Sequence, residues 1–133
     1  MRQGIQLELK DTDIKEYGCY ALCIIQWAEI ETYSAFTDVD ILDIINKART
    51  SGIIGPECFV INPPALFNIA AGKNLKTQCV KTTVPGKPTS ICCNKKPMYT
   101  HFTLWTDGKT WDPLPPNRSS AKAYKPDSWR VLS

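Results

Sequence analysis

The spacing of apolar residues changes near the middle of this 133-residue chain, and this change constrains the fold more than any other feature. The first half has apolar residues at helical intervals, whereas the second half alternates and is rich in β-branched residues and turn dipeptides. Helices followed by antiparallel strands are typical of α+β domains. The chain has no internal repeat or linker, so the sequence predicts one domain over residues 1–133, with N-terminal helices packed on a C-terminal antiparallel sheet.

Apolar spacing and capping residues predict three helices. A short extended segment is expected over residues 4–9. The three helices are expected from about Cys19 to about Glu31, over residues 37–52 and over residues 62–72. Gly18 permits a close approach of chain segments before the first helix. Thr37 and Asp40 have capping-box spacing in the second, for which we expect one apolar face made of Val39, Leu42, Ile45 and Ala48. Asn62 is the expected N-cap of the third helix.

Strand signals follow. Residues 75–84 alternate and are rich in β-branched residues, which predicts a strand, and residues 85–90 have turn composition. The segment "THFTLWTDGKTWDP", residues 100–113, carries Asp107-Gly108 between aromatic and β-branched residues, a strong hairpin signal. Residues 127–133 are predicted as a last short strand.

Composition and charge exclude several classes of function. The net charge of +3, from 16 basic and 13 acidic residues, is too small to indicate a nucleic-acid partner. The N-terminal segment is polar and the longest apolar stretch is too short to span a bilayer, so we expect a cytoplasmic monomer that does not bind membranes. Six lysines crowd the middle of the chain and are interpreted as solvated faces, with an anion-binding patch as the alternative: Lys73, Lys76, Lys81, Lys87, Lys95 and Lys96.

The six cysteines have no spacing typical of a metal site. No C-x-x-C pair occurs, and the one pair at comparable spacing, Cys19 and Cys23, lies within a predicted helix. The sequence therefore predicts no metal and no cofactor, with most thiols serving as small core residues.

The only histidine, His101, lies where it can meet a carboxylate. A two-residue turn at 107 and 108 places Thr103 opposite Asp112, so that His101 and Asp112 are diagonal neighbours on one face of the hairpin. Such neighbours are within reach of an imidazole, and the carboxylate would fix its tautomer and favour the imidazolium.

Cys19 is the candidate partner of this pair. A thiol in the first turn of a helix lies at the positive end of the helix dipole, which favours the thiolate, and a nearby histidine can accept its proton. Cys23 lies one turn deeper and lacks this advantage. Local sequence leaves the alternative open that Cys19 is a buried core thiol and His101 an ordinary strand residue.

The stretches "YGCYALCII" and "HFTLWTDGKTWDP" resemble the papain-like cysteine peptidase superfamily in its minimal bacterial forms. The layout is most similar to bacteriocin leader peptidases, and to small uncharacterised bacterial and phage families in which a tail such as "AYKPDSWRVL" follows the Asp-Pro. The resemblance implies a papain-like fold. It also implies that Cys19 is the nucleophile, His101 the general base and acid, and Asp112 the orienting residue.

One position departs from the pattern of that family. These peptidases place a glutamine about six residues before the cysteine, where its amide contributes to the oxyanion hole, and this chain has Asp13 there. A carboxylate would repel the developing oxyanion, and losing one such donor costs on the order of 10²–10³ in rate. Gln6 is too distant along the chain to be assigned this role from sequence. Candidates for substrate contact are Gly18, Tyr20, Tyr99 and Trp111.

Two functions follow from these residues. The first is a cysteine peptidase or amidase that cleaves an amide bond in a peptide or protein through a Cys19–His101–Asp112 triad and a thioester. The second is a degraded papain-like domain that binds a peptide or protein, with the aromatic residues Tyr99, Trp105, Trp111 and Trp129 lining a groove or forming the hairpin core. A redox or metal-handling thiol protein is the third hypothesis.

Overall fold

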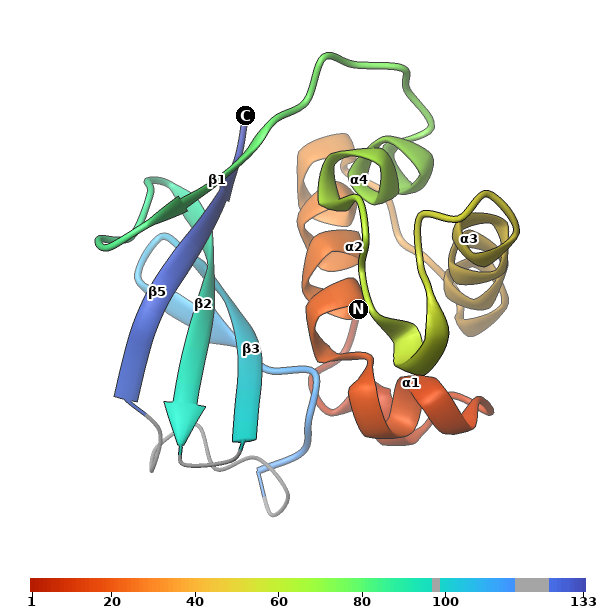
Figure 1. Cartoon of the computed structure of the whole chain (residues 1–133), viewed down its shortest axis with the longest axis horizontal. Helices are drawn as coiled ribbons and strands as arrows, with labels where there is room; N and C mark the ends of the chain where they lie inside the picture. Colours follow the sequence, from red (N-terminus) through yellow and green to blue (C-terminus); the bar gives the residue numbers. More distant parts are fainter. Residues whose placement is uncertain (97–98, 117–124) are drawn as a thin grey trace.

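Helices and strands separate into two layers, which confirms the predicted α+β class (Figure 1). The computed structural model describes residues 1–96, 99–116 and 125–133. The helical elements are η1 (Ile5–Leu7), α1 (Thr12–Tyr17), α2 (Cys19–Thr32), α3 (Asp38–Thr50), η2 (Pro56–Cys58) and α4 (Pro63–Ala71). The strands are β1 (Cys79–Thr82), β2 (Thr89–Lys96), β3 (Tyr99–Thr106), β4 (Lys109–Trp111) and β5 (Lys125–Leu132).

Helix α2 lies between the sheet and the other helices (Figure 1). Every residue from Ala21 to Glu29 is buried, because α4 covers one side of the helix and β3 the other. A helix that is apolar nearly all round is typical of such a central position. The predicted start at Cys19 is confirmed, and the helix continues to Thr32.

Helices α3 and α4 are confirmed together with their caps. The Thr37 and Asp40 side chains each accept a hydrogen bond from the other's backbone N–H, and the Asn62 side chain accepts from Ala65 N. The predicted apolar face of α3 is partly wrong, because Val39 is 66% exposed. Residues at strict intervals of three drift around a helix with 3.6 residues per turn. The buried stripe instead has i, i+3, i+4, i+7 spacing and consists of Ile41, Ile44, Ile45 and Ala48.

The extended segment predicted over residues 4–9 is wrong, because η1 forms there, and α1, which follows it, was not predicted. Asp11 caps α1 by accepting a hydrogen bond from Ile14 N. Arg49 of α3 holds Asp11 through two hydrogen bonds of 2.7 and 3.0 Å, and this contact lowers the pKa of the Asp11 carboxyl. The N-terminal helical segment thus depends on a distant ion pair that local sequence does not reveal.

The sheet has the order β1-β5-β2-β3-β4, and all neighbouring strands are antiparallel. The sequence-based prediction missed its central strand, β2, and assigned the first residues of that strand to a turn. Ile91 and Cys93 face the helices, while Asn94 is buried on the opposite face and donates to the Thr103 hydroxyl and to the His101 carbonyl. This mixture of buried polar and apolar residues gives β2 little pattern that could be recognised in the sequence.

The hairpin between β3 and β4 has the predicted turn and register. Asp107 and Gly108 have φ values of 49° and 78°, as in a type I′ turn, and Thr106 pairs with Lys109. Strand β4 ends at Trp111, so Asp112 follows directly after the paired residues. The predicted last strand is confirmed as β5. It lies inside the sheet, because it pairs with β1 on one side and with β2 on the other.

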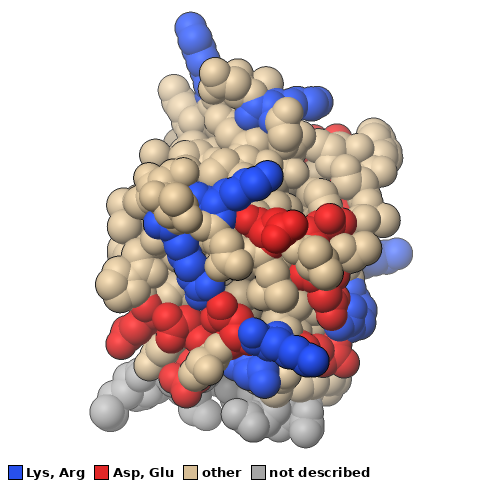
Figure 2. Space-filling view, turned by 90° about the vertical axis from the view of Figure 1, so that its right-hand side faces the viewer, with Lys and Arg blue, Asp and Glu red and all other residues tan. Residues whose placement is uncertain are grey.

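Charges of both signs lie side by side on the face of the molecule in Figure 2. The six crowded lysines do not form one patch: Lys73, Lys76 and Lys87 border a hollow of about 600 Å³ near the end of β5, whereas Lys95 pairs with Asp127 at 3.4 Å. The side chain of Lys96 lies outside the described part of the structure. Within the described residues, no helix combines the length and apolar character needed to cross a bilayer.

Gly18, between α1 and α2, has a structural role that can be tested. A Cβ atom at this position would lie 2.6 Å from the Ile14 carbonyl oxygen. We therefore expect Gly18→Ala to lower the free energy of unfolding by about 1–3 kcal/mol, as overpacking does. Chemical denaturation would measure this loss. Gly55→Ala is the matched control, because its nearest neighbour, at 3.1 Å, is the end of the flexible Ile61 side chain. Equal losses in the two variants would contradict this role.

Candidate active site

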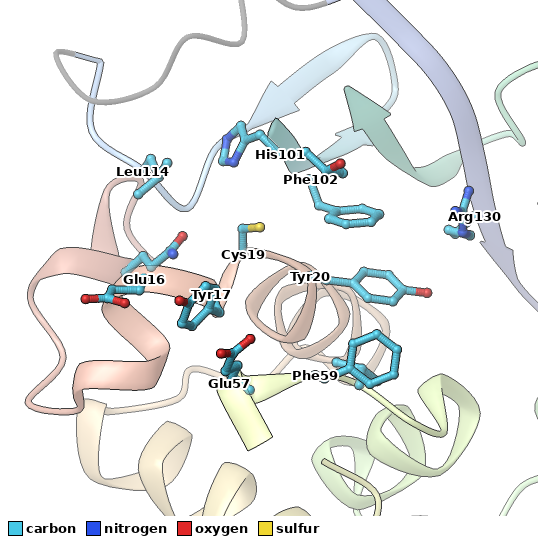
Figure 3. A pocket seen from close by; sticks show the side chains of 14 residues that line it. Glu16, Tyr17, Cys19, Tyr20, Glu57, Phe59, His101, Phe102, Leu114 and Arg130 are labelled. Atoms are coloured by element: carbon cyan, nitrogen blue, oxygen red, sulfur yellow. The ribbon is translucent and has the colours of Figure 1, made fainter. Parts of the chain in front are cut away.

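A cleft of about 570 Å³ opens where the helical layer meets the start of β3 (Figure 3). Its described lining comes from η1, α1, the start of α2, η2, β3 and β5, and includes Gln6, Glu16, Tyr17, Cys19, Tyr20, Glu57, Cys58, Phe59, Val60, Thr100, His101, Phe102, Leu114 and Arg130. A cleft of this size is in the range of small-ligand and peptide sites. Two of the three predicted triad residues, Cys19 and His101, line it.

Cys19 is the first residue of α2 and is half-buried. Its side chain lies opposite the His101 ring across the cleft (Figure 3), and interaction with the thiol contributes to the raised pKa of that ring. The backbone N–H groups of the first helical turn have no intrahelical acceptors, so this end of α2 favours negative charge. The structure therefore brings together the thiol and the imidazole that the sequence analysis paired.

His101 is held by Asp112. The Nε2 atom lies 2.8 Å from Asp112 Oδ1, and the His101 side chain is only 2% exposed. Burial lowers the pKa of His101, but the hydrogen bonds with Asp112 and Cys19 outweigh burial and raise the pKa from 6.5 to about 9. With Nε2 bound to the carboxylate, Nδ1 is the ring nitrogen left for the thiol. Asp112 is itself fixed, because its Oδ1 also accepts a hydrogen bond from Leu114 N at 2.9 Å.

The N-terminal segment is joined to the chain around Asp112. The backbone N–H of Gly4 donates to Asp112 O at 3.0 Å, and that of Gln6 donates to Pro113 O at 2.9 Å. The Trp111 indole donates to Met1 O at 3.0 Å. These bonds place η1 against the residues that orient His101, and they bring Gln6 into the cleft.

The residue at the position expected for the oxyanion group, Asp13, lies outside the described lining of the cleft. Asp13 is exposed on α1. Gln6 lines the cleft instead and is 2% exposed. Its Nε2 donates to Lys15 O at 3.1 Å, which leaves a second N–H of the same amide, and its Oε1 has no hydrogen-bond partner among the described residues. The sequence analysis did not assign this role to Gln6 because of its distance from Cys19 along the chain, which α1 spans in the structure.

The residues expected to contact substrate have different roles. Tyr20 lines the cleft and stacks on Phe102, with ring centroids 4.4 Å apart. Gly18 and Trp111 are not among the described lining residues: Gly18 packs against α1, and Trp111 packs on the core. Tyr99 begins β3, but its side chain lies outside the described part.

A separate hollow of about 520 Å³ lies on the sheet face turned away from the helices. Trp105 and Trp129 line it, in an edge-to-face contact with ring centroids 6.2 Å apart. These two aromatic residues, which the binding hypothesis placed in a groove, thus lie on the opposite face of the sheet from Trp111. They do not line the cleft that holds Cys19.

The remaining thiols have environments unlike that of Cys19. All six cysteines are free. Cys23 is fully buried, and its burial raises the pKa of its thiol well above the usual value, which removes it as a competing nucleophile. Within the described ranges, no three His, Cys, Asp or Glu side chains are grouped so that they could hold a metal ion.

Comparison with known proteins gives one match. A family model described as "Protein of unknown function, DUF261" matches residues 4–133. Neither the curated proteins nor the solved structures contain a match to the chain.

Proposed function

Since the chain belongs to the DUF261 family, whose description assigns no activity, we propose a function from its own site: a papain-like cysteine hydrolase that cleaves an amide bond in a peptide or protein. One observation carries the proposal. The thiol at the start of α2 meets a buried imidazole that a carboxylate holds from the other side, and all three groups border or support one open cleft. Nucleophile, base and orienting residue in this order make up the general arrangement for acyl transfer.

The reaction begins with proton transfer from the Cys19 thiol to His101. The raised pKa of His101, about 9, keeps the imidazolium stable at neutral pH, and its charge stabilises the thiolate. The thiolate sulfur then attacks the carbonyl carbon of the substrate, and the carbonyl oxygen becomes an oxyanion. His101 gives its proton to the leaving nitrogen, the C–N bond breaks and a thioester remains on Cys19. Water, deprotonated by His101, attacks the thioester and releases the acid product and the thiol.

Two groups are placed to stabilise the oxyanion. The Cys19 backbone N–H lies at the first position of α2, where helix geometry supplies no acceptor. The Gln6 amide lines the same cleft and is oriented by the Lys15 carbonyl, so its second N–H is the other proposed donor. Asp13, the position that favoured a catalytically degraded site, is exposed on α1 and is not among the described residues that line the cleft, which supports the hydrolase proposal over the binding alternative.

Covalent trapping tests the proposal. The protein would be incubated with a short peptide that carries a thiol-reactive vinyl sulfone in place of the scissile amide, and intact mass would be followed by peptide mapping. A single adduct on Cys19 is expected, because only this thiol faces a proton acceptor in an open cleft. Adducts distributed over several cysteines, in proportion to exposure, would contradict the proposal.

Gln6→Ala is expected to lower kcat by about 10²–10³ with little change in KM, as removal of one oxyanion donor does. The backbone bond from Gln6 N to Pro113 O is kept in this variant, so η1 should stay in place. Asp13→Asn is the control, and hydrolysis of a peptide substrate is the measurement. Unchanged kcat in Gln6→Ala, or a comparable loss in Asp13→Asn, would remove Gln6 from this role.

A further inference from the structure

The cleft carries charges of opposite sign at its two ends. Glu16 and Glu57 lie beside Tyr17 on one side of Cys19, and Arg130 lies on the other side, beyond Tyr20 and Phe102 (Figure 3). We infer that the cleft selects an extended peptide in which a basic side chain and a carboxylate flank an apolar residue. This inference rests on the proposed hydrolase activity and specifies its substrate class.

Arg130 is the cationic end. Its guanidinium donates to the Ser128 hydroxyl at 2.8 Å and to the Trp129 carbonyl at 3.4 Å. Within residues 1–96, 99–116 and 125–133, no carboxylate forms an ion pair with it. Its partner across the β1–β5 pairing is Lys81, another cation. Like charges in directly opposed positions are unfavourable, and a half-buried guanidinium is best satisfied by a carboxylate, so this end favours an anionic group of a ligand.

Glu57 and Glu16 form the acidic end. Both are exposed, and neither makes an ion pair with any basic group in the described part of the chain. The negative potential of these two carboxylates acts on Tyr17: Glu57, and to a smaller extent Glu16, raise the pKa of its hydroxyl. Opposite the Arg130 end, this potential attracts the ammonium or guanidinium of a bound peptide.

The surface between the two ends is apolar. Tyr20 and Phe102 stack with an interplanar angle of 23°, and Arg130 lies 6.0 Å from the centre of the Phe102 ring. Phe59 is 68% exposed at the rim of the same cleft. A stacked aromatic surface of this kind accepts an aliphatic or aromatic side chain. The apolar residue of the peptide therefore occupies the middle, and the two oppositely charged ends of the cleft fix the direction of the chain.

The test uses peptides with blocked termini that carry Lys, Phe and Glu in this order, in the reverse order, or with Gln replacing both charged residues. We expect the better of the two charged orders to exceed the neutral peptide at least tenfold in kcat/KM. A further peptide lacks the Glu but keeps a free C-terminal carboxylate, which distinguishes a side-chain carboxylate from a terminal one. Equal turnover of charged and neutral peptides would overturn the inference and leave the hydrolase proposal intact.

Substitutions at the two charged ends of the cleft identify the residue responsible for each part of the charge preference. Glu57→Gln should remove the preference for the Lys residue and Arg130→Gln that for the carboxylate, whereas Arg130→Lys should retain most of it. Asp43→Asn and Lys109→Gln change the same charges on exposed surfaces outside the cleft and serve as controls. Binding of the peptides to Cys19→Ala protein, measured by fluorescence anisotropy, separates the inference about substrate class from the hydrolase proposal. Charge-dependent binding without turnover by the wild type would overturn hydrolysis alone, and absence of both would overturn both.

Discussion

Replacing Cys19 by alanine is expected to lower peptide hydrolysis by on the order of 10⁴-fold or more, because loss of the nucleophile of a triad removes the acyl-enzyme route completely. The thiol is half-buried at the first position of α2, and alanine is a good helix former, so the fold should be retained. The measurements are kcat/KM on a peptide substrate and the rate of iodoacetamide labelling at mildly acidic pH, with circular dichroism to confirm folding. Both activity and the fast-labelling site should disappear together.

Cys79→Ala is the matched control for this variant. Cys79 is also free and half-buried, and it lies near the Tyr20 hydroxyl at 3.8 Å without lining the cleft. Its removal should leave both hydrolysis and fast labelling close to those of the wild type. Fast labelling that survives in Cys19→Ala and disappears in Cys79→Ala would transfer the reactive role to the other thiol and contradict the proposed mechanism.

Asp112→Ala is expected to reduce kcat by about 10³–10⁴-fold, the range seen when the orienting residue of a triad is lost. Asp112→Asn removes the charge but keeps an amide oxygen that can still accept from His101 and from Leu114 N. Comparison of the two variants therefore separates the orienting role of Asp112 from its electrostatic role.

The pH dependence of activity and of stability provides a second measurement for the Asp112 variants. The folded-state pKa of His101, about 9, is above the ordinary value of 6.5, so the charged imidazolium is favoured by folding. The resulting contribution to stability is complete below about pH 6.5 and is lost as the pH rises through about 9. Activity should have its alkaline limb in the same range. In Asp112→Asn both the limb and the loss of stability should move to lower pH, and an unmoved limb would show that another group controls it.

Much of the fold could be predicted because its signals are local. The Asp107-Gly108 turn requires positive φ at two adjacent residues, and few other dipeptides tolerate it. The caps of α3 and α4 likewise depend on side chains within three residues of the backbone groups that they satisfy. The hairpin register followed from the turn, and with it the contact between His101 and Asp112.

The features that could not be predicted depend on contacts between distant segments. Strand β2 is held as the central strand by pairing on both sides, although its own pattern is weak. Gln6 reaches the cleft only because the first residues of the chain bond to the backbone around Asp112. The spacing in the resembling family indicated Asp13, which lies on α1 outside the described lining of the cleft, whereas Gln6 lines the cleft.

The division of the cleft between the two layers has a consequence for how the protein is made. Cys19 belongs to the helical layer, whereas His101 in β3 and Asp112, directly after β4, are translated much later. At about 5–20 residues per second, roughly 4–16 s pass on the ribosome between the emergence of the thiol and that of its base. In the proposed mechanism, the Cys19 thiol therefore gains its proton acceptor only after the β3–β4 hairpin has been translated and has folded onto the helical layer.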